Sequence, residues 1–154
     1  MKVFIENEAG SDQKNLYNEK TLKFRKAVTV SRKYPYPYGF ILDTTSGDGD
    51  NVDVFIITDK ALKTGEIVEC EPVSLMEQME KSWDESKSEV DEIDHNVLMV
   101  LKGKNQDVVS EEVKAELTEF VLHVFDHIRL NKNRVGKFLD RDKAIEYVES
   151  CRDM

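Results

Sequence analysis

The sequence predicts a mainly β protein with some α-helix (α+β), folded as a small closed β-barrel with two C-terminal helices packed on it. Short segments of β-branched and aromatic residues recur over the first two thirds of the chain. Long polar connections separate these segments. Helical spacing of apolar residues is clearest in the last third. This order favours a closed sheet on which the helices pack.

The expected strands cover residues 1–7, 21–33, 40–42, 52–58, 66–75 and 97–101. In the strand over 52–58, Val52, Val54 and Ile56 share one face, because side chains alternate along a strand. Asp53 therefore lies on the other face, beside apolar residues. Pro72 has no backbone N–H, so the strand over 66–75 is expected at a sheet edge or with a bulge. Residues 8–15 have the composition of a loop.

The clearest predicted helix covers residues 110–130, with Ser110 as N-cap and two glutamates in its first turn. Its apolar stripe consists of Val113, Leu117, Phe120, Val121, Val124 and Ile128. A second, shorter helix covers 139–151, with Asp140 as its cap. His123 and His127 lie four residues apart, a spacing that suits a transition metal, but a structural or subunit-contact role is the preferred interpretation.

Residues 76–96 are the least regular part of the chain and are rich in acidic residues. Met76, Met79 and Trp83 have helical spacing, which predicts an inserted helix over 76–87 that packs on the barrel or on a second subunit.

Composition limits the classes of function. The 154 residues are expected to form one domain, 1–154, and 34% of them are charged, which predicts a soluble protein. The net charge of −9 argues against nucleic acid and membrane surfaces as partners, because both attract basic proteins. Two distant cysteines, Cys70 and Cys151, predict no disulfide framework. With no signal-like or membrane-spanning stretch in the sequence, the expected location is the cytoplasm.

The most informative stretch covers residues 33–59, where three aspartates follow a tyrosine- and proline-rich approach. Asp48, Asp50 and Asp53 lie within six residues, and glycines 47 and 49 allow a tight turn there. Carboxylates so close together repel one another unless a cation lies between them. Oxygen ligands of this kind suit Mg²⁺ or Mn²⁺. The alternative is an ordinary turn with solvated aspartates.

Two segments of this stretch carry a resemblance. Tyr34-Pro35 through Tyr38-Gly39-Phe40, followed by Asp48-Gly49-Asp50-Asn51-Val52-Asp53, resembles the signature of the family I (soluble) inorganic pyrophosphatases, in the spacing of the shorter bacterial members. That signature reads Asp-Gly-Asp-Pro-x-Asp after Tyr-Pro-x-x-Tyr-Gly, and Asn51 replaces its proline. The resemblance implies a five-stranded OB-like barrel that hydrolyses pyrophosphate to two phosphates with Mg²⁺, or with Mn²⁺ as a substitute. It also implies a homo-oligomer, with a hexamer favoured over a smaller assembly.

The resemblance further implies roles for individual residues. The implied metal ligands are Asp48, Asp53, Asp94, Asp50 and Glu89, with Asp91 as the alternative to Glu89. Asp50 would also act as general base, together with Tyr38 as the second catalytic residue. The implied phosphate-binding residues are Lys14, Tyr38, Arg129 and either Lys26 or Arg25. Glu6 and Tyr34 would support these side chains from behind.

Three departures from the family pattern leave alternatives open. A family glutamate two residues past Lys14 is Leu16, a lysine is Asn96, and a tyrosine before Arg129 is Ile128. These changes fit either an active enzyme or a catalytically impaired protein that still binds metal and phosphate. The three aspartates also fit a hydrolase of another phosphoanhydride. We favour the pyrophosphatase because the aspartates and Tyr38 are intact.

Overall fold

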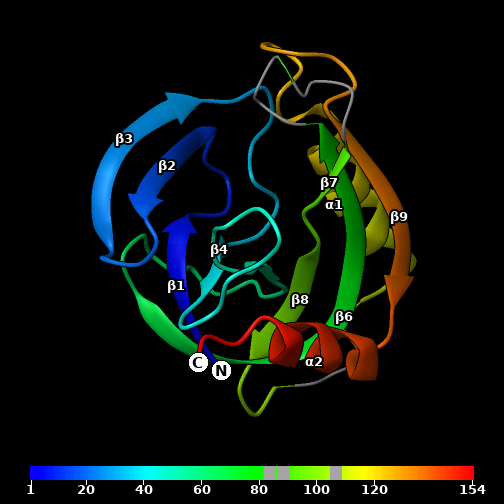
Figure 1. Ribbon diagram of the computed structural model, residues 1–154. Helices are drawn as coiled ribbons and strands as arrows, with labels where there is room; N and C mark the ends of the chain where they lie inside the picture. Colours follow the sequence, from blue (N-terminus) through cyan, green and yellow to red (C-terminus); the bar gives the residue numbers. More distant parts are fainter. Residues whose placement is uncertain (82–85, 87–90, 105–108) are drawn as a thin grey trace.

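The computed structural model describes residues 1–81, 86, 91–104 and 109–154 (Figure 1). The strands are β1 Lys2–Asn7, β2 Gln13–Asn18, β3 Lys23–Thr29, β4 Tyr38–Ile41, β5 Asp53–Ile56, β6 Ile67–Lys81, β7 Asp91–Ile93, β8 Asn96–Leu101 and β9 Asn133–Leu139. The helices are α1 Glu111–His123 and α2 Arg141–Ser150. The mainly β class with two C-terminal helices is therefore confirmed.

The main sheet closes on itself. Its strands are ordered β1-β4-β5-β8-β6, and β6 pairs back to β1 through contacts such as Val3 with Val68. The β5–β8 pair is parallel, whereas the other pairs around this ring are antiparallel. The ring of five strands confirms the expected closed barrel. Strands β7 and β9 both pair with β6 and extend the sheet at one side.

Strand β6 is much longer than expected and replaces part of a predicted helix. It runs from Ile67 to Lys81, so the helix predicted over 76–87 is wrong for residues 76–81, and Trp83 lies outside the described residues. Met76 and Met79 pair with β9, which lies far away in the sequence. The pairing provides backbone hydrogen-bond partners that favour a strand. The spacing of apolar residues within 76–87 cannot reveal a partner so distant in the sequence. The expected bulge is present, because the register with β8 shifts between Pro72 and Ser74.

A separate two-stranded hairpin, β2–β3, lies beside the barrel (Figure 1). Its first strand, Gln13–Asn18, includes residues expected in a loop. An aromatic contact attaches the hairpin to the barrel, since the Tyr17 ring lies 5.0 Å from the Phe4 ring of β1 between centroids. Within the hairpin, the Tyr17 ring also lies 5.5 Å from the Phe24 ring. The hairpin thereby covers one side of the cavity described below.

Helix α1 begins as expected and ends early. The Ser110 Oγ accepts a hydrogen bond from the Val113 N–H at 3.2 Å, and the helix ends at His123 rather than near residue 130. Residues after His123 form turns, and the Ile128 side chain is 60% exposed. Helix α2 is capped by Asp140, which accepts from the Lys143 N–H at 3.0 Å. No helix in the described part of the chain is long and apolar enough to cross a membrane.

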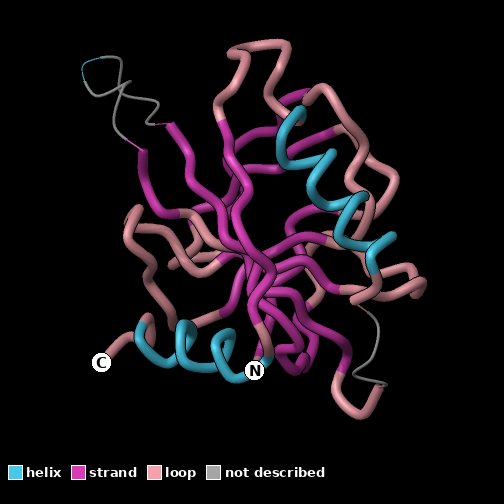
Figure 2. Tube along the Cα trace, turned by 90° about the vertical axis from the view of Figure 1, so that its right-hand side faces the viewer, coloured by secondary structure: helices cyan, strands magenta, loops and turns pink. Residues whose placement is uncertain are grey.

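The two faces of β5 pack into two different apolar clusters, as the alternation of its side chains predicted. Val54 and Ile56 belong to a cluster that includes Ala144 and Val148 of α2. Phe55 belongs to the other cluster, which packs against α1. Figure 2 shows the two helices against different parts of the strands. Asp53 thus points to the same side as Phe55, and this is the side on which the polar cavity opens.

Candidate active site

A polar cavity of about 420 Å³ lies between the β2–β3 hairpin, the barrel and α1. Most of its wall is charged or aromatic. The polar and aromatic residues that line it include Glu6, Lys14, Tyr17, Glu19, Arg25, Tyr34, Tyr38, Asp48, Asp50, Asp53, Gln78, Glu80, Glu92, Asp94 and Asn96. The sequence motif and distant residues from several other strands therefore meet at one place.

The aspartate turn is ordered by its own side chains. The Asp48 Oδ1 accepts hydrogen bonds from the Ser46 Oγ at 2.6 Å and from the Asp50 N–H at 3.0 Å. Gly49 adopts φ +90°, a left-handed conformation that favours glycine, and this allows the chain to reverse between the two aspartates. Partial burial and the neighbouring Asp48 raise the pKa of Asp50. Asp48 and Asp50 are exposed at the mouth of the cavity, and Asp53 lies half-buried inside it.

In the interior of the cavity, Asp94 contacts two other carboxyl groups. Asp94, in the turn before β8, is hydrogen-bonded to Asp53 and to Glu80. Burial and the charge of Asp53 raise the pKa of Asp94 well above its usual range, so Asp94 is the proton donor. Burial also raises the pKa of Asp53 to about 6. A cation bound beside Asp53 and Asp94 would favour their charged forms and so oppose the effect of burial.

Lys14 and two tyrosines form the part of the cavity wall next to these carboxyl groups. The Lys14 Nζ lies 5.1 Å from the centroid of the Tyr38 ring and donates a hydrogen bond to Tyr34. Burial disfavours the charge on Lys14, but nearby Tyr34, Glu6 and Asp53 outweigh it and raise the pKa of the ammonium. Tyr38 donates a hydrogen bond to Asp53. The cation is thus held in its charged form beside the carboxylates.

Glu6 lies behind this wall, at the end of β1. Its side chain is 3% exposed, and burial raises the pKa of its carboxyl group to about 8 even though the Lys14 charge lowers it. A neutral or lysine-paired carboxyl at this depth suits a supporting position better than a solvent-exposed surface position.

Arg25 lines the cavity, and the adjacent Lys26 is not among its lining residues. The register places Lys26 opposite Leu16 and Phe24 opposite Tyr17, so Arg25 is the extra residue of a bulge. A bulge redirects a side chain, which explains why counting residues could not choose between the two cations. Arg129 lies in the turns after α1 and is also not among the lining residues.

Three further residues of the segment 76–96 were named from the resemblance, namely Glu89, its alternative Asp91, and Asn96. Glu89 lies outside the described residues, and of Asp91 only the backbone, at the start of β7, is described. Asn96 is buried and donates a hydrogen bond to Gln78, while its Oδ1 has no partner in the described part of the chain. This unpaired oxygen belongs to a residue of the cavity wall and is available to a bound ligand or water.

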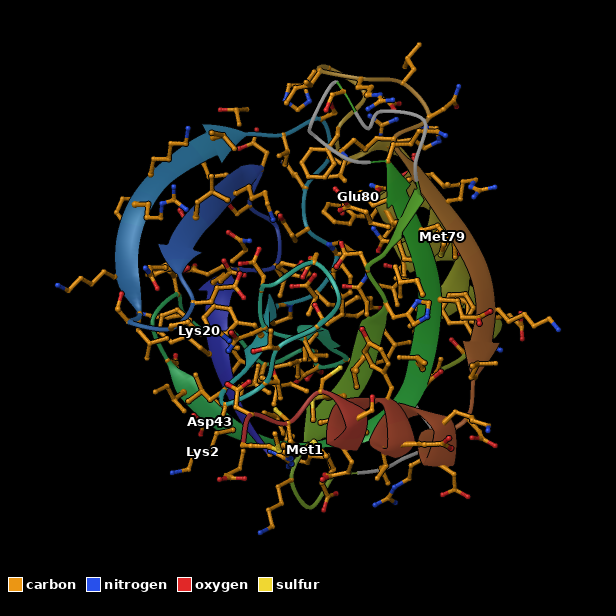
Figure 3. The ribbon with its side chains drawn as sticks, viewed as in Figure 1. Met1, Lys2, Lys20, Asp43, Met79 and Glu80 are labelled. Carbon is orange, nitrogen blue, oxygen red and sulfur yellow. The ribbon has the colours of Figure 1, made fainter. Side chains whose placement is uncertain are left out.

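Sequence reasoning missed several polar residues of the cavity wall, among them Gln78, Glu80, Glu92 and Glu19. Gln78 and Glu80 alternate along β6, so interpreting residues 76–81 as a strand would have placed both on one face. Figure 3 shows Glu80 toward the upper end of β6. Glu19 lies in the hairpin turn, and no pattern in the sequence identifies it. Burial, together with the charges of Glu6 and Asp53, raises its pKa to about 9.

The donor set fits a hard divalent cation that is bound together with water and phosphate. Carboxylates from separate elements face the same cavity, and their pKa values are raised first by burial and then by one another's charges. Among the described residues, no three His, Cys, Asp or Glu side chains are arranged to hold an ion unaided. Mg²⁺ requires no such cage, because it commonly keeps several waters and binds one or two carboxylates plus substrate phosphates.

The two histidines of the α1 region have separate structural partners. The His123 Nδ1 lies 2.7 Å from the Asp126 Oδ2, and the His127 Nδ1 lies 2.6 Å from the Ser31 Oγ. These contacts connect the end of α1 to its own turn and to the segment after β3.

Comparison with known proteins gives one family. The family model for inorganic pyrophosphatase matches residues 3–154. A curated inorganic pyrophosphatase from Thermoplasma volcanium is 29% identical over 159 aligned positions, covering 97% of this chain and 90% of the relative. The relative from Nanoarchaeum equitans is 26% identical and is covered over 94% of its length, with 98% of this chain aligned.

Solved structures agree in fold. The inorganic pyrophosphatase of Thermus thermophilus superimposes with a TM-score of 0.82 at 26% identity, covering 98% of this chain and 88% of that one. The enzyme from Neisseria gonorrhoeae gives a TM-score of 0.83 at 20% identity with the same two coverages, and at this identity the likeness concerns the fold alone.

The barrel and these relatives define an enzyme of the phosphoanhydride-hydrolase class. Within that class, this chain belongs to the inorganic pyrophosphatase family, whose model covers almost all of its length.

Proposed function

We propose that this protein hydrolyses inorganic pyrophosphate to two phosphates with Mg²⁺ as the preferred cation and Mn²⁺ as a substitute. The observation that carries the proposal is the single cavity in which Asp48, Asp50 and Asp53 face Lys14 and Arg25. Pyrophosphate is a small polyanion, so its site requires cations for the phosphate oxygens and a group that accepts a proton from water.

The carboxylates take two roles in this proposal. Asp48, Asp53 and Asp94 hold the divalent cations from one wall. When bound, these cations neutralise phosphate oxygens and lower the pKa of the attacking water. Asp50, which lies at the cavity mouth, takes the proton of that water as its oxygen attacks one phosphorus. The bond from this phosphorus to the bridging oxygen breaks, and the bridging oxygen leaves on the second phosphate.

The cations of the chain bind and orient the substrate. Lys14 and Arg25 contact the phosphate oxygens, and Arg25 forms paired hydrogen bonds that a lysine cannot form. Tyr38 holds Asp53 and donates to phosphate when that carboxylate is occupied by a cation. Glu6 and Tyr34 keep Lys14 charged and in place. Arg129 is assigned no direct contact, because it is not among the residues of the cavity wall.

Residues 1–154 are proposed to act as one domain that assembles into a homo-oligomer. The turns after α1 expose Ile128 and Leu130 at 60% and 68%, which provides an apolar contact surface next to the helix.

The test is phosphate release from magnesium pyrophosphate and from magnesium ATP, measured side by side with and without EDTA. The expected result is rapid release from pyrophosphate, little from ATP, and none with EDTA. Preferential release from ATP would assign the cavity to a different phosphoanhydride, and no release from either substrate would contradict an enzymatic role.

A further inference from the structure

The residue that replaces the signature proline connects two parts of the cavity. The backbone N–H of Asn51 donates a hydrogen bond to the Glu19 Oε1 at 2.9 Å. A proline at position 51 has no N–H and cannot make this contact. The hydrogen bond therefore exists only because the chain departs from the family signature here.

The side chain of Asn51 strengthens the same connection. Its Oδ1 accepts from the Lys20 Nζ at 2.6 Å, and its Nδ2 donates to the Ile41 carbonyl at 2.9 Å. Lys20 also donates to the Thr44 carbonyl at 2.7 Å. Figure 3 shows Lys20 at the turn of the β2–β3 hairpin. Asn51 is 2% exposed and Lys20 lies nearer the surface, so these contacts form a partly buried junction between the hairpin turn and the aspartate turn.

The junction directs the Glu19 carboxylate into the cavity. Glu19 is half-buried, lines the cavity wall, and is close enough to Glu6, Asp50 and Asp53 to interact with their charges. One of its oxygens is used by Asn51, and the other has no hydrogen-bond partner among the residues described. Leu16, which stands where the family has a glutamate, lines the same cavity with an apolar side chain.

We propose that Glu19 supplies the carboxylate that is missing at position 16 to the proposed metal site of Asp48, Asp53 and Asp94. Asn51 holds the Glu19 side chain in the cavity. In this chain the carboxylate comes from the turn of the β2–β3 hairpin, whereas position 16 lies in strand β2 of the same hairpin. Its ligand is a hard divalent cation or a water bound to one, so this inference rests on the proposed metal-dependent function. Glu19 thus binds the cation directly or through its water and has no role in proton transfer.

The experiment measures Mn²⁺ binding to the free protein by calorimetry and by electron paramagnetic resonance, with no substrate present. Glu19→Gln keeps an oxygen for the Asn51 N–H and removes the charge. It is expected to weaken Mn²⁺ binding by about 10-fold, as is usual when a supporting group of a metal site is lost. Adding Leu16→Glu to this variant is expected to recover most of the affinity, because residue 16 faces the same cavity. Glu112→Gln, an exposed change on α1, is the control and should bind as the wild type does.

Unchanged Mn²⁺ affinity in Glu19→Gln, or a wild-type protein that binds no Mn²⁺, overturns the inference. Phosphate release by the wild type is scored separately. Active wild type with unchanged binding in Glu19→Gln rejects the role of Glu19 and leaves the pyrophosphatase proposal in place. Weakened binding in Glu19→Gln with an inactive wild type supports Glu19 and rejects pyrophosphate hydrolysis.

Discussion

The Lys14 ammonium lies 5.1 Å from the centroid of the Tyr38 ring, so a cation and an aromatic ring of the cavity wall are in direct contact. Tyr38 also donates a hydrogen bond to Asp53. A cation over the ring face is attracted by the ring quadrupole. Tyr38 therefore contacts both Lys14 and Asp53, the carboxylate expected to hold metal. A substitution at Lys14 or Asp53 is expected to shift Tyr38 and, through it, the other residue.

Asp50→Asn is expected to lower turnover by roughly 10²–10⁴-fold, the usual contribution of a general base. The amide keeps the shape of the side chain but does not accept the proton. Turnover is measured by phosphate release at saturating Mg²⁺, and Mn²⁺ binding is measured in parallel and should remain. Asp59→Asn, an exposed change shortly after β5, is the matched control. A wild-type rate in Asp50→Asn would remove this residue from the mechanism.

Arg25→Gln is expected to lower kcat/KM for pyrophosphate by roughly 10-fold or more, because a hydrogen bond to a charged group contributes about 1.5–3 kcal/mol. Lys26→Gln provides an adjacent control with the same change in charge. It should have little effect, since Lys26 is exposed and Arg25 is the residue of the bulge that lines the cavity. Equal losses in both variants would indicate a general electrostatic effect and would contradict a specific phosphate contact of Arg25.

Asn96→Lys is expected to reduce the Mg²⁺ concentration needed for half-maximal turnover. The new ammonium would lie on the cavity wall close in sequence to Asp94 and would offset part of the carboxylate charge. Ile128→Tyr, the other restoration of the family pattern, should change nothing, because Ile128 is 60% exposed and is not among the lining residues. An increased Mg²⁺ requirement in Asn96→Lys would show that position 96 has been aligned wrongly.

Without divalent cations, the protein should lose stability as the pH rises from about 5 to about 8. The pKa values of Glu6 and Glu19 are raised from 4.5 to about 8 and about 9, so over this window the folded protein binds more protons than the unfolded chain. The free energy of unfolding therefore falls with increasing pH. Thermal unfolding in EDTA tests this, and Mg²⁺ should raise the Tm more at the higher pH. A Tm in EDTA that increases over this range would contradict the assigned shifts.

The chain is expected to self-associate, with a hexamer favoured and a smaller assembly as the alternative. Ile128 and Leu130 are large apolar side chains that the isolated chain leaves exposed. Size-exclusion chromatography with light scattering at micromolar concentration measures the mass. A variant with Ile128→Ser and Leu130→Ser should shift the mass toward the monomer, whereas Ile67→Ser on β6 is the control for lost apolar surface. A monomeric wild type would refute the prediction.

The sequence by itself determined the fold class, the aspartate turn and the alternation of β5. These depend on local rules, because glycine permits the turn at Gly49 and the pleat sends Asp53 to the side opposite Val54. Ser110 and Asp140 likewise act as the caps that their side chains predict, since an N-cap needs only a nearby backbone N–H.

The tertiary structure alone decided which distant residues complete the site. Residues 76–81 became a strand because β9 provides backbone partners from more than fifty positions away. The pairing of β6 with β7, and the hydrogen bond from the Asp94 N–H to the Gln78 carbonyl, brought Glu80 to Asp94. Arg25 was selected over Lys26 by a bulge, and Glu19 entered the cavity through one backbone hydrogen bond from Asn51. Such contacts depend on the register between strands and on the meeting of separate turns, and neither is encoded in the spacing of residues along the chain.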